Sequence, residues 1–147
     1  MKKIIYLFIF IIFFQPTYSS SSSYLMLKNS EVNVRYGPGF SYPIKFKYKK
    51  RFLPLKVIDK KENFRKIIDH KKNSGWIHWT QLKKSKSFIL FKNQILFSKP
   101  TKYSKPIAKI YSGRLLLAKK CKLKWCKVKT DEYEGWITTD NLWGNFE

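Results

Sequence analysis

The chain has 147 residues, with 31 Lys or Arg against 9 Asp or Glu, which gives a formal net charge of +22 at pH 7. This length holds one domain or two small ones, which excludes a large multidomain enzyme. Hydrophobic residues make up 44% and aromatic residues 18% of the sequence. Such a composition can form a core and excludes a chain that is disordered throughout.

Residues 1–19 are predicted to be a cleaved secretory signal peptide. Two lysines precede an unbroken apolar run over residues 4–14. A run of this length matches the core of a signal peptide, about 7 to 15 residues, and is shorter than the roughly 20 residues of a membrane-spanning helix. Small residues at alternate positions place the cleavage after residue 19, and residues 20–23 read as a serine-rich spacer. An uncleaved anchor is the alternative.

Export determines which partners the positive charge can meet. Without the leader, 29 basic and 9 acidic residues remain, a net charge of +20. This charge faces envelope polymers and membrane surfaces instead of the genome. We therefore expect no nucleic acid among the partners. Contact with a membrane surface is allowed, without integration into the bilayer.

The remaining sequence reads as two copies of one unit, residues 24–86 and 87–147. Four segments of the first copy recur in the second at offsets of 60 to 63 residues, and the drift in offset indicates changes in loop length. The matched pairs are Gly75-Trp76-Ile77 with Gly135-Trp136-Ile137, Gln81-Leu82 with Asn141-Leu142, 63–67 with 124–128, and 41–44 with 104–107.

Within each copy the hydrophobic residues recur with a period of two, which predicts β-strands with one solvated face. Ile44, Phe46 and Tyr48 alternate with lysines, and Cys126 and Val128 do the same. We expect these lysines to be spread around the outer faces. Turn-forming residues separate the strands at short intervals, at 37–39, 61–63, 72–75, 112–113 and 131–135. About five short strands per copy predict an all-β fold of two small closed barrels.

Residues 31–44 resemble the opening strand and first loop of the bacterial SH3-like (Src-homology-3-type) domain family, and residues 75–78 resemble its closing strand. The second copy reduces the Arg-x-Gly-Pro-Gly element to Ser98-Lys99-Pro100 and keeps Gly135-Trp136-Ile137. This order is similar to that of tandem exported SH3-domain proteins of alphaproteobacterial envelopes, over essentially the whole mature chain. The resemblance implies two tandem SH3-like barrels in the periplasm of a Gram-negative bacterium. It also implies a non-catalytic module that binds cell-wall peptide, peptidoglycan or an envelope protein.

Glycine, proline and tryptophan at repeated or turn positions are predicted to be structural. In the first loop, glycines would allow positive φ angles and close turns, and prolines would stiffen the ends. Glycine before each repeated tryptophan would mark a tight bend where a strand begins. The predicted structural residues are Gly37, Pro38, Gly39, Gly75, Trp76, Gly135 and Trp136.

Cys121 and Cys126 are predicted to form a disulfide. They bracket four residues between two predicted strands, and a hairpin with a four-residue loop would place them opposite each other, within disulfide range. An oxidising compartment favours the bond, and two free buried thiols are the alternative. Neither a metal nor a cofactor is expected, because only His70 and His78 could join the cysteines and both belong to the other copy.

No group of residues predicts catalysis, so we expect a protein that is not an enzyme. His70 lies in a turn-like charged run and His78 follows the tryptophan strand, where surface or half-buried roles are commoner than a general base. No two acidic residues suggest an acid and base pair. Cell-wall cysteine peptidases often carry SH3-like domains, but their nucleophile lies in a separate domain that has no counterpart here.

The candidate ligand-binding residues are those that the repeat makes specific to the first copy. Sequence alignment pairs Tyr36 with Lys99, Tyr42 with Lys105, Trp79 with Thr139, and Arg35 with Ser98. One shallow groove lined by Arg35, Tyr36, Tyr42 and Trp79 would suit an extended peptide with a carboxylate. Alternatively, the tyrosines cover the loop's glycines and prolines, the arginine pairs with a local acid, and the tryptophan fills a gap between the barrels.

Two other functions are compatible with the sequence. The barrels could be a structural or adaptor part of an envelope complex, or the charge could bind anionic polymers or lipid headgroups. Exposed rings would favour a groove, whereas a contiguous basic face would favour a polyanion binder.

Overall fold

The computed structural model describes residues 23–146, so the predicted signal peptide and most of the predicted spacer lie outside the described residues. Regular structure in this part of the chain consists of β-strands and one short 3₁₀ helix, η1 (Trp79–Gln81). This confirms the predicted all-β class. Over the same range, no helix is long and apolar enough to cross a membrane.

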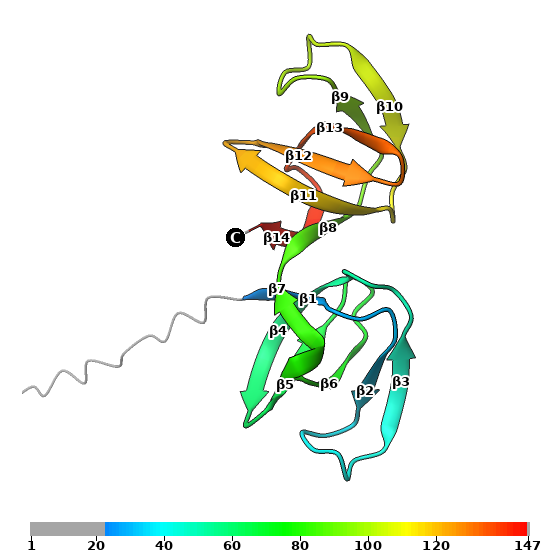
Figure 1. Ribbon diagram of the computed structural model, residues 1–147, viewed down its shortest axis with the longest axis vertical. Helices are drawn as coiled ribbons and strands as arrows, with labels where there is room; N and C mark the ends of the chain where they lie inside the picture. The colour runs from blue at the N-terminus through cyan, green and yellow to red at the C-terminus, as the bar shows by residue number, and fades with distance from the viewer. Residues whose placement is uncertain (1–22, 147) are drawn as a thin grey trace, which may run out of the picture.

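Each copy forms one antiparallel sheet of seven strands, two more than the sequence pattern suggested, and the two sheets have the same strand order (Figure 1). The first has the order β3-β2-β6-β5-β4-β1-β7 and the second β10-β9-β13-β12-β11-β8-β14. The strands of the first sheet are β1 (Tyr24–Leu27), β2 (Val32–Arg35), β3 (Ile44–Tyr48), β4 (Pro54–Lys61), β5 (Phe64–Ile68), β6 (Ser74–His78) and β7 (Leu82–Lys84). Those of the second are β8 (Lys86–Leu90), β9 (Gln94–Phe97), β10 (Pro106–Ile110), β11 (Leu115–Lys122), β12 (Trp125–Thr130), β13 (Tyr133–Thr138) and β14 (Leu142–Phe146).

Each sheet curls around its own hydrophobic core, which the alternating residues supply. The first core includes Leu27, Val32, Val34, Leu55, Ile67 and Ile77, and the second includes Leu90, Leu96, Leu116, Val128 and Ile137. Strand β3 departs from the predicted pattern, because Tyr48 is buried while Phe46 is half-buried and Ile44 is exposed. Strand β3 is an edge strand that pairs with β2, so its side chains are less enclosed than those of a central strand.

Strand β8 joins the two cores. Phe88 and Leu90 point into the second core, whereas Ile89 between them belongs to the first. The Ser87 hydroxyl donates a hydrogen bond of 2.7 Å to the Phe52 carbonyl. Trp143 also packs against the first core. The two copies therefore meet through continuous apolar packing, and Trp79, which is 52% exposed, is not among the side chains that fill this contact.

The glycines act by permitting close approach and not by the backbone angles that the sequence suggested. Neither Gly37 nor Gly39 has a positive φ. A Cβ at Gly37 would instead overlap the ring of Tyr42. Gly75 and Gly135 lie inside β6 and β13 and not at a bend before them. A Cβ at Gly135 would lie 2.7 Å from the Phe97 carbonyl oxygen, so glycine lets a neighbouring strand approach.

A disulfide joins Cys121 and Cys126, which are directly paired in the β11–β12 ladder with their Cα atoms 4.1 Å apart. The predicted four-residue loop is wrong, because the ladder continues for one more pair, Lys122 with Trp125. A two-residue turn remains, and its first residue, Leu123, has a φ of 53°. The alternating pattern thus continues beyond the cysteines to the end of the hairpin.

Candidate functional site

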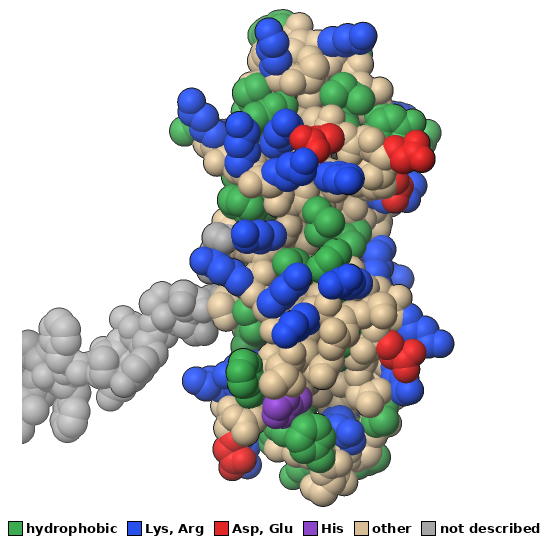
Figure 2. Space-filling model, viewed as in Figure 1, with side chains coloured by type: hydrophobic (Ala, Val, Ile, Leu, Met, Phe, Trp, Pro, Cys, Tyr) green, Lys and Arg blue, Asp and Glu red, His purple; other side chains and the backbone are tan. Residues whose placement is uncertain are grey.

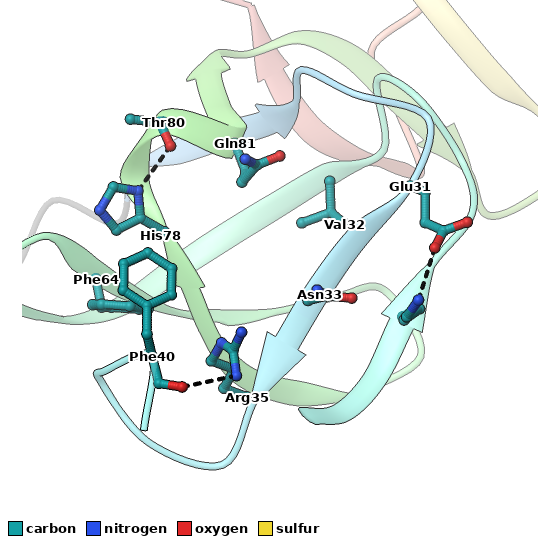
Figure 3. Close-up of a pocket in the computed structure, with 10 residues that line it drawn as sticks. Glu31, Val32, Asn33, Arg35, Phe40, Phe64, His78, Thr80 and Gln81 are labelled. Carbon is teal, nitrogen blue, oxygen red and sulfur yellow. Dashed lines mark hydrogen bonds and ion pairs between the residues drawn. The ribbon is translucent and has the colours of Figure 1, made fainter. Parts of the chain in front are cut away.

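The first sheet carries a groove of about 340 Å³ between its first loop and the 3₁₀ turn after β6 (Figure 3). Strand β2 supplies Val32, Asn33 and Arg35, and the loop after it supplies Phe40. The opposite side comes from the end of β6 and the turn that follows. The groove therefore lies where three elements that are distant in sequence come together.

Three rings form one end of the groove. Phe40 and His78 lie 5.1 Å apart between ring centroids, with an angle of 33° between their planes. Both contact Phe64, at 5.3 and 5.1 Å, with edge-to-face geometry. Phe64 is buried and directly pairs with His78 across β5 and β6. Phe40 is 68% exposed, so its ring is free to meet a ligand.

Arg35 holds the first loop in place beside these rings. Its Nη1 donates hydrogen bonds to the carbonyl oxygens of Phe40 (3.2 Å) and Tyr42 (2.7 Å), and its guanidinium carbon lies 5.6 Å from the centroid of the Phe40 ring. The alternative that Arg35 pairs with a local acid is wrong, because its partners are backbone carbonyls. Within residues 23–146 no further partner of Nε or Nη2 is seen, which leaves these donors for a ligand.

The other end of the groove is polar. Glu31 and Lys47 form an exposed ion pair of 2.9 Å, and this contact lowers the pKa of the Glu31 carboxyl group. The side chain of Gln81 accepts a hydrogen bond of 2.6 Å from Asn29. Nδ1 of His78 is hydrogen-bonded to Oγ1 of Thr80, 2.8 Å away. The groove thus runs from an aromatic end to an end with amide, carboxylate and ammonium groups.

Of the four predicted ligand-binding residues, Arg35 alone lines this groove. Tyr36 is 62% exposed and lies beside Lys45, whose Nζ is 5.6 Å from its ring centroid. Tyr42 packs over Gly37, as the alternative interpretation of the loop had it. Trp79 is exposed and follows His78. Tyr36 follows Arg35 directly after β2, where successive side chains of an extended chain point to opposite sides. Trp79 begins the 3₁₀ helix η1 after His78, and neither residue lines the groove.

The sequence alignment of the first loops is wrong by one residue. Arg35 pairs with Trp76 in the ladder, and Phe97 pairs with Trp136 in the same way. Arg35 therefore corresponds to Phe97 and not to Ser98. The loop hydrogen bonds agree: the amide of Tyr36 bonds to the carbonyl of residue 43, and the amide of Ser98 to that of residue 105. Matching two Ser-x-Pro segments caused the slip, and in a strand a one-residue slip exchanges the two faces.

With the register corrected, the second sheet has the equivalent groove, of about 290 Å³, with different chemistry. Each key side chain of the first groove is replaced: Arg35 by Phe97, Phe40 by Lys102, His78 by Thr138, and Thr80 by Asp140. Phe97 packs edge-to-face on Trp125, the counterpart of Phe64, with 6.0 Å between centroids. The cluster of three rings beside a guanidinium is thus specific to the first copy.

Sequence reasoning did not include Phe40, Phe64 or His78 among the candidate ligand-binding residues. Phe40 was detectable, because it is aromatic while its counterpart Lys102 is not, but only in the correct register. His78 was expected to be a surface or half-buried side chain without a catalytic role, and it is half-buried. Only the pairing of Phe64 with His78 across β5 and β6 shows that its ring joins the cluster.

The charged run that contains His70 has a structural role, although Nδ1 of His70 is buried without a hydrogen-bond partner within residues 23–146. Asp69 is buried and accepts a hydrogen bond of 3.0 Å from the Tyr48 hydroxyl. Burial of the Tyr48 hydroxyl, together with the negative charge of Asp69 beside it, strongly raises the pKa of Tyr48. Burial also lowers the pKa of the neighbouring His70. Within residues 23–146, no three His, Cys, Asp or Glu side chains are grouped as metal ligands would be. Trp76 is buried, and Trp136 is half-buried beneath Lys120, whose Nζ is 5.4 Å from its ring centroid.

Comparison with known proteins places both sheets in one family. The family model described as the bacterial SH3 domain matches residues 28–84 and 92–144. No curated protein matches the chain. Among solved structures, NlpC2 from Trichomonas vaginalis is 13% identical, with 85% of this chain and 49% of that chain covered and a TM-score of 0.38. An NlpC/P60 family protein from Bacillus cereus ATCC 10987 is 12% identical, with 82% and 55% covered and a TM-score of 0.39.

The chain spans about half the length of these solved structures. The two family matches extend over more than half of the chain and confirm the resemblance of residues 31–44 and 75–78 to SH3-like domains. They also confirm that the two sheets are tandem SH3-like barrels. The protein therefore belongs to the bacterial SH3 domain family, with two tandem copies of the domain.

Proposed function

We propose that this protein is a non-catalytic binding module of the bacterial cell envelope, and that the groove of its first domain binds cell-wall peptide. The observation that supports this most strongly is the cluster of Phe40, Phe64 and His78 beside Arg35. Both domains have the same strand order, and the second forms its sheet without such a cluster. The strand order therefore does not require this cluster, which leaves ligand binding as its role in this proposal.

The groove has the chemistry that an extended peptide with a carboxylate requires. The exposed face of Phe40 offers a stacking surface, since aromatic rings bury large areas with defined geometry. The unused Nε and Nη2 donors of Arg35 suit a carboxylate, which an arginine can bind through two parallel hydrogen bonds. At the polar end, Asn33 and Lys47 can bond to peptide carbonyl groups. A short acidic peptide lying along β2 would meet all three.

Catalysis does not enter this proposal. The cysteines of the described residues are joined in a disulfide, so neither is a free nucleophile. His78 lies among aromatic rings and is hydrogen-bonded to Thr80, and no carboxylate within residues 23–146 orients it as in a nucleophile and base pair. In this proposal the leader directs the chain to the periplasm, where cell-wall peptides are within reach.

The test is binding of purified peptidoglycan and of its soluble peptides, measured by pull-down and calorimetry. Phe40→Ala removes the exposed ring and should weaken binding about tenfold, since an aromatic side chain of this kind contributes on the order of 1 to 2 kcal/mol when covered. Tyr103→Ala is the matched control, because Tyr103 is a fully exposed aromatic residue in the equivalent loop of the second domain. Binding that Phe40→Ala leaves intact would contradict the assignment of the groove.

A second variant tests the residues that the sequence singled out. Tyr36 and Trp79 are both exposed, and replacing the two together with alanine should leave peptide binding within about threefold. Tyr42 is kept in this variant, because its ring packs over Gly37 in the loop that carries Phe40. If the double variant abolishes binding while Phe40→Ala does not, the ligand lies on the flank of the loop and not in the groove.

A further inference from the structure

The β11–β12 hairpin of the second domain ends in an exposed apolar side chain. Leu123 is 92% exposed at the apex of a two-residue turn. Its φ of 53° is a conformation that branched residues seldom adopt, and one where Asn or Gly would be more stable. A leucine at this position neither favours the positive φ of the turn nor buries its side chain in the core, so folding does not explain its presence.

Lysines surround this apex. Residues 119–129 contain six lysines and no acidic residue. Lys119 and Lys127 bond to Glu134 on the adjacent strand β13. The other four have no acidic partner within residues 23–146, and they are Lys120, Lys122, Lys124 and Lys129. Figure 1 shows the hairpin projecting sideways from the second sheet, and Figure 2 shows basic side chains gathered on that side of the molecule.

The first domain provides an internal comparison. Its β4–β5 hairpin has the same two-residue turn, and the residue that corresponds to Leu123 is Glu62, with a φ of 47°. Asp59 adds a second acidic group there. The same backbone therefore carries a mixed-charge tip in one domain and an apolar tip among lysines in the other.

The disulfide adds a second difference at the same place. Cys121 and Cys126 join the two strands one pair below the turn, where the first domain has Lys60 opposite Arg65. A covalent link this close to the apex restricts how far the two strands can separate. The disulfide therefore limits the conformations of the hairpin tip, so less conformational entropy is lost when the tip binds a surface.

We propose that this hairpin tip docks on an anionic lipid surface, with Leu123 entering the headgroup region and the surrounding lysines contacting lipid phosphates. A convex apolar tip flanked by ammonium groups matches the boundary of a bilayer, where the apolar side chain leaves water and each lysine meets opposite charge. A hydrated anionic polymer would use the lysines but would gain nothing from an apex leucine. This surface lies in the second domain and is separate from the peptide groove of the first.

The experiment measures co-sedimentation of the exported protein with vesicles of equal parts phosphatidylglycerol and phosphatidylcholine, and with phosphatidylcholine alone, at about 0.1 M salt. The protein should bind the anionic vesicles and not the neutral ones. Leu123→Asn, which suits the positive φ and removes the apolar group, should weaken binding about tenfold. Lys122→Gln with Lys124→Gln should weaken it by about tenfold or more, since each lysine near such a surface contributes about 1 kcal/mol.

The matched control is Lys60→Gln with Lys61→Gln, which removes two charges from the equivalent hairpin and should have little effect on vesicle binding. Circular dichroism of each variant verifies that the fold is kept. Equal weakening by both double variants would show that diffuse charge causes the binding, and would overturn the proposal. Unchanged binding of Leu123→Asn, with heparin competing equally well against both proteins, would assign the tip to anionic polymers and would also overturn it.

Discussion

Replacing Asp69 with alanine should destabilise the first domain by about 3 to 4 kcal/mol, although Asp69 lies in a run of charged residues that looks like an ordinary surface turn. The side chain is only 2% exposed. It organises the β5–β6 turn and ties that turn to strand β3. Its removal therefore affects both a local and a long-range contact.

The magnitude follows from the hydrogen bonds that the carboxylate accepts. Two come from the amides of Lys71 and Asn73 (2.8 and 2.9 Å), one from Nδ2 of Asn73 (2.9 Å), and one from the hydroxyl of Tyr48 (3.0 Å). A hydrogen bond to a charged group is worth about 1.5 to 3 kcal/mol. The amides lie at exposed residues and can bond to water instead, so they contribute little. The Tyr48 hydroxyl is buried and would lose its acceptor, which accounts for most of the loss.

Urea unfolding followed by tryptophan fluorescence provides the measurement. Asp69→Asn keeps one acceptor oxygen and should cost about half as much as Asp69→Ala. Thr130→Ala, at the corresponding position of the second domain, removes a single hydrogen bond of 3.1 Å to the Leu115 carbonyl and should cost about 1 kcal/mol. Combining Asp69→Ala with Tyr48→Phe should be less destabilising than the sum of the two. Strict additivity, or a cost below about 1 kcal/mol for Asp69→Ala, would refute this account.

Three further outcomes are expected. Hydrogen bonds from Lys119 and Lys127 lower the pKa of Glu134 to about 2. The stability that the Glu134 carboxylate contributes is therefore fully present above the pKa of an unfolded-chain glutamate and is lost as the pH falls towards 2. The unfolding curves of Glu134→Gln and the native protein should converge as the pH approaches 2. Reduction of the Cys121–Cys126 bond should cost about 2 kcal/mol or less, because the closed loop is short, and should lower the melting temperature of the second domain only. Gly37→Ala should lower the free energy of unfolding by about 1 to 2 kcal/mol and weaken peptide binding, since the added methyl group displaces the Tyr42 ring and with it the loop that holds Phe40. An unchanged melting temperature would contradict this prediction.

The fold followed from the sequence because two signals agreed. The period of two predicted strands such as the one that holds Cys126 and Val128, which are both buried, and the repeat indicated that each strand has a counterpart. Strand β8 shows where this reasoning ends. Residues 88–90 are uniformly apolar, so no alternation indicated that Ile89 faces the first core while its neighbours face the second. Burial on both faces removes the pattern that the prediction needs.

The site followed only in part, because a groove depends on register as well as on residue type. Arg35 was assigned to the first loop from its motif, and the structure places it in the groove. Tyr36 was grouped with it as its neighbour in sequence, yet neighbours in a strand face opposite ways. Phe64 and His78 are 14 positions apart in the sequence and meet only because β5 pairs with β6. Such contacts become visible once the ladder is known.

Asp69 illustrates a different limit. Its sequence surroundings, Asp69-His70-Lys71-Lys72, read as a solvated turn, and charged residues are seldom buried without partners. The partners here are a tyrosine two strands away in sequence and an asparagine four residues later. Their convergence depends on how the β5–β6 turn folds back on β3, which no local pattern reports.

Comparison of the two domains separates what the barrel requires from what a ligand requires. Positions whose side chains match in both, such as Trp76 with Trp136 and Ile77 with Ile137, serve packing that both sheets need. The grooves and the hairpin tips differ instead in charge and aromatic character, on backbones with the same strand order. Because these differing positions are exposed or half-exposed, their identities are under little constraint from stability. The ring cluster of the first domain and the apolar, lysine-flanked tip of the second are therefore the two places where binding is expected, one on each domain.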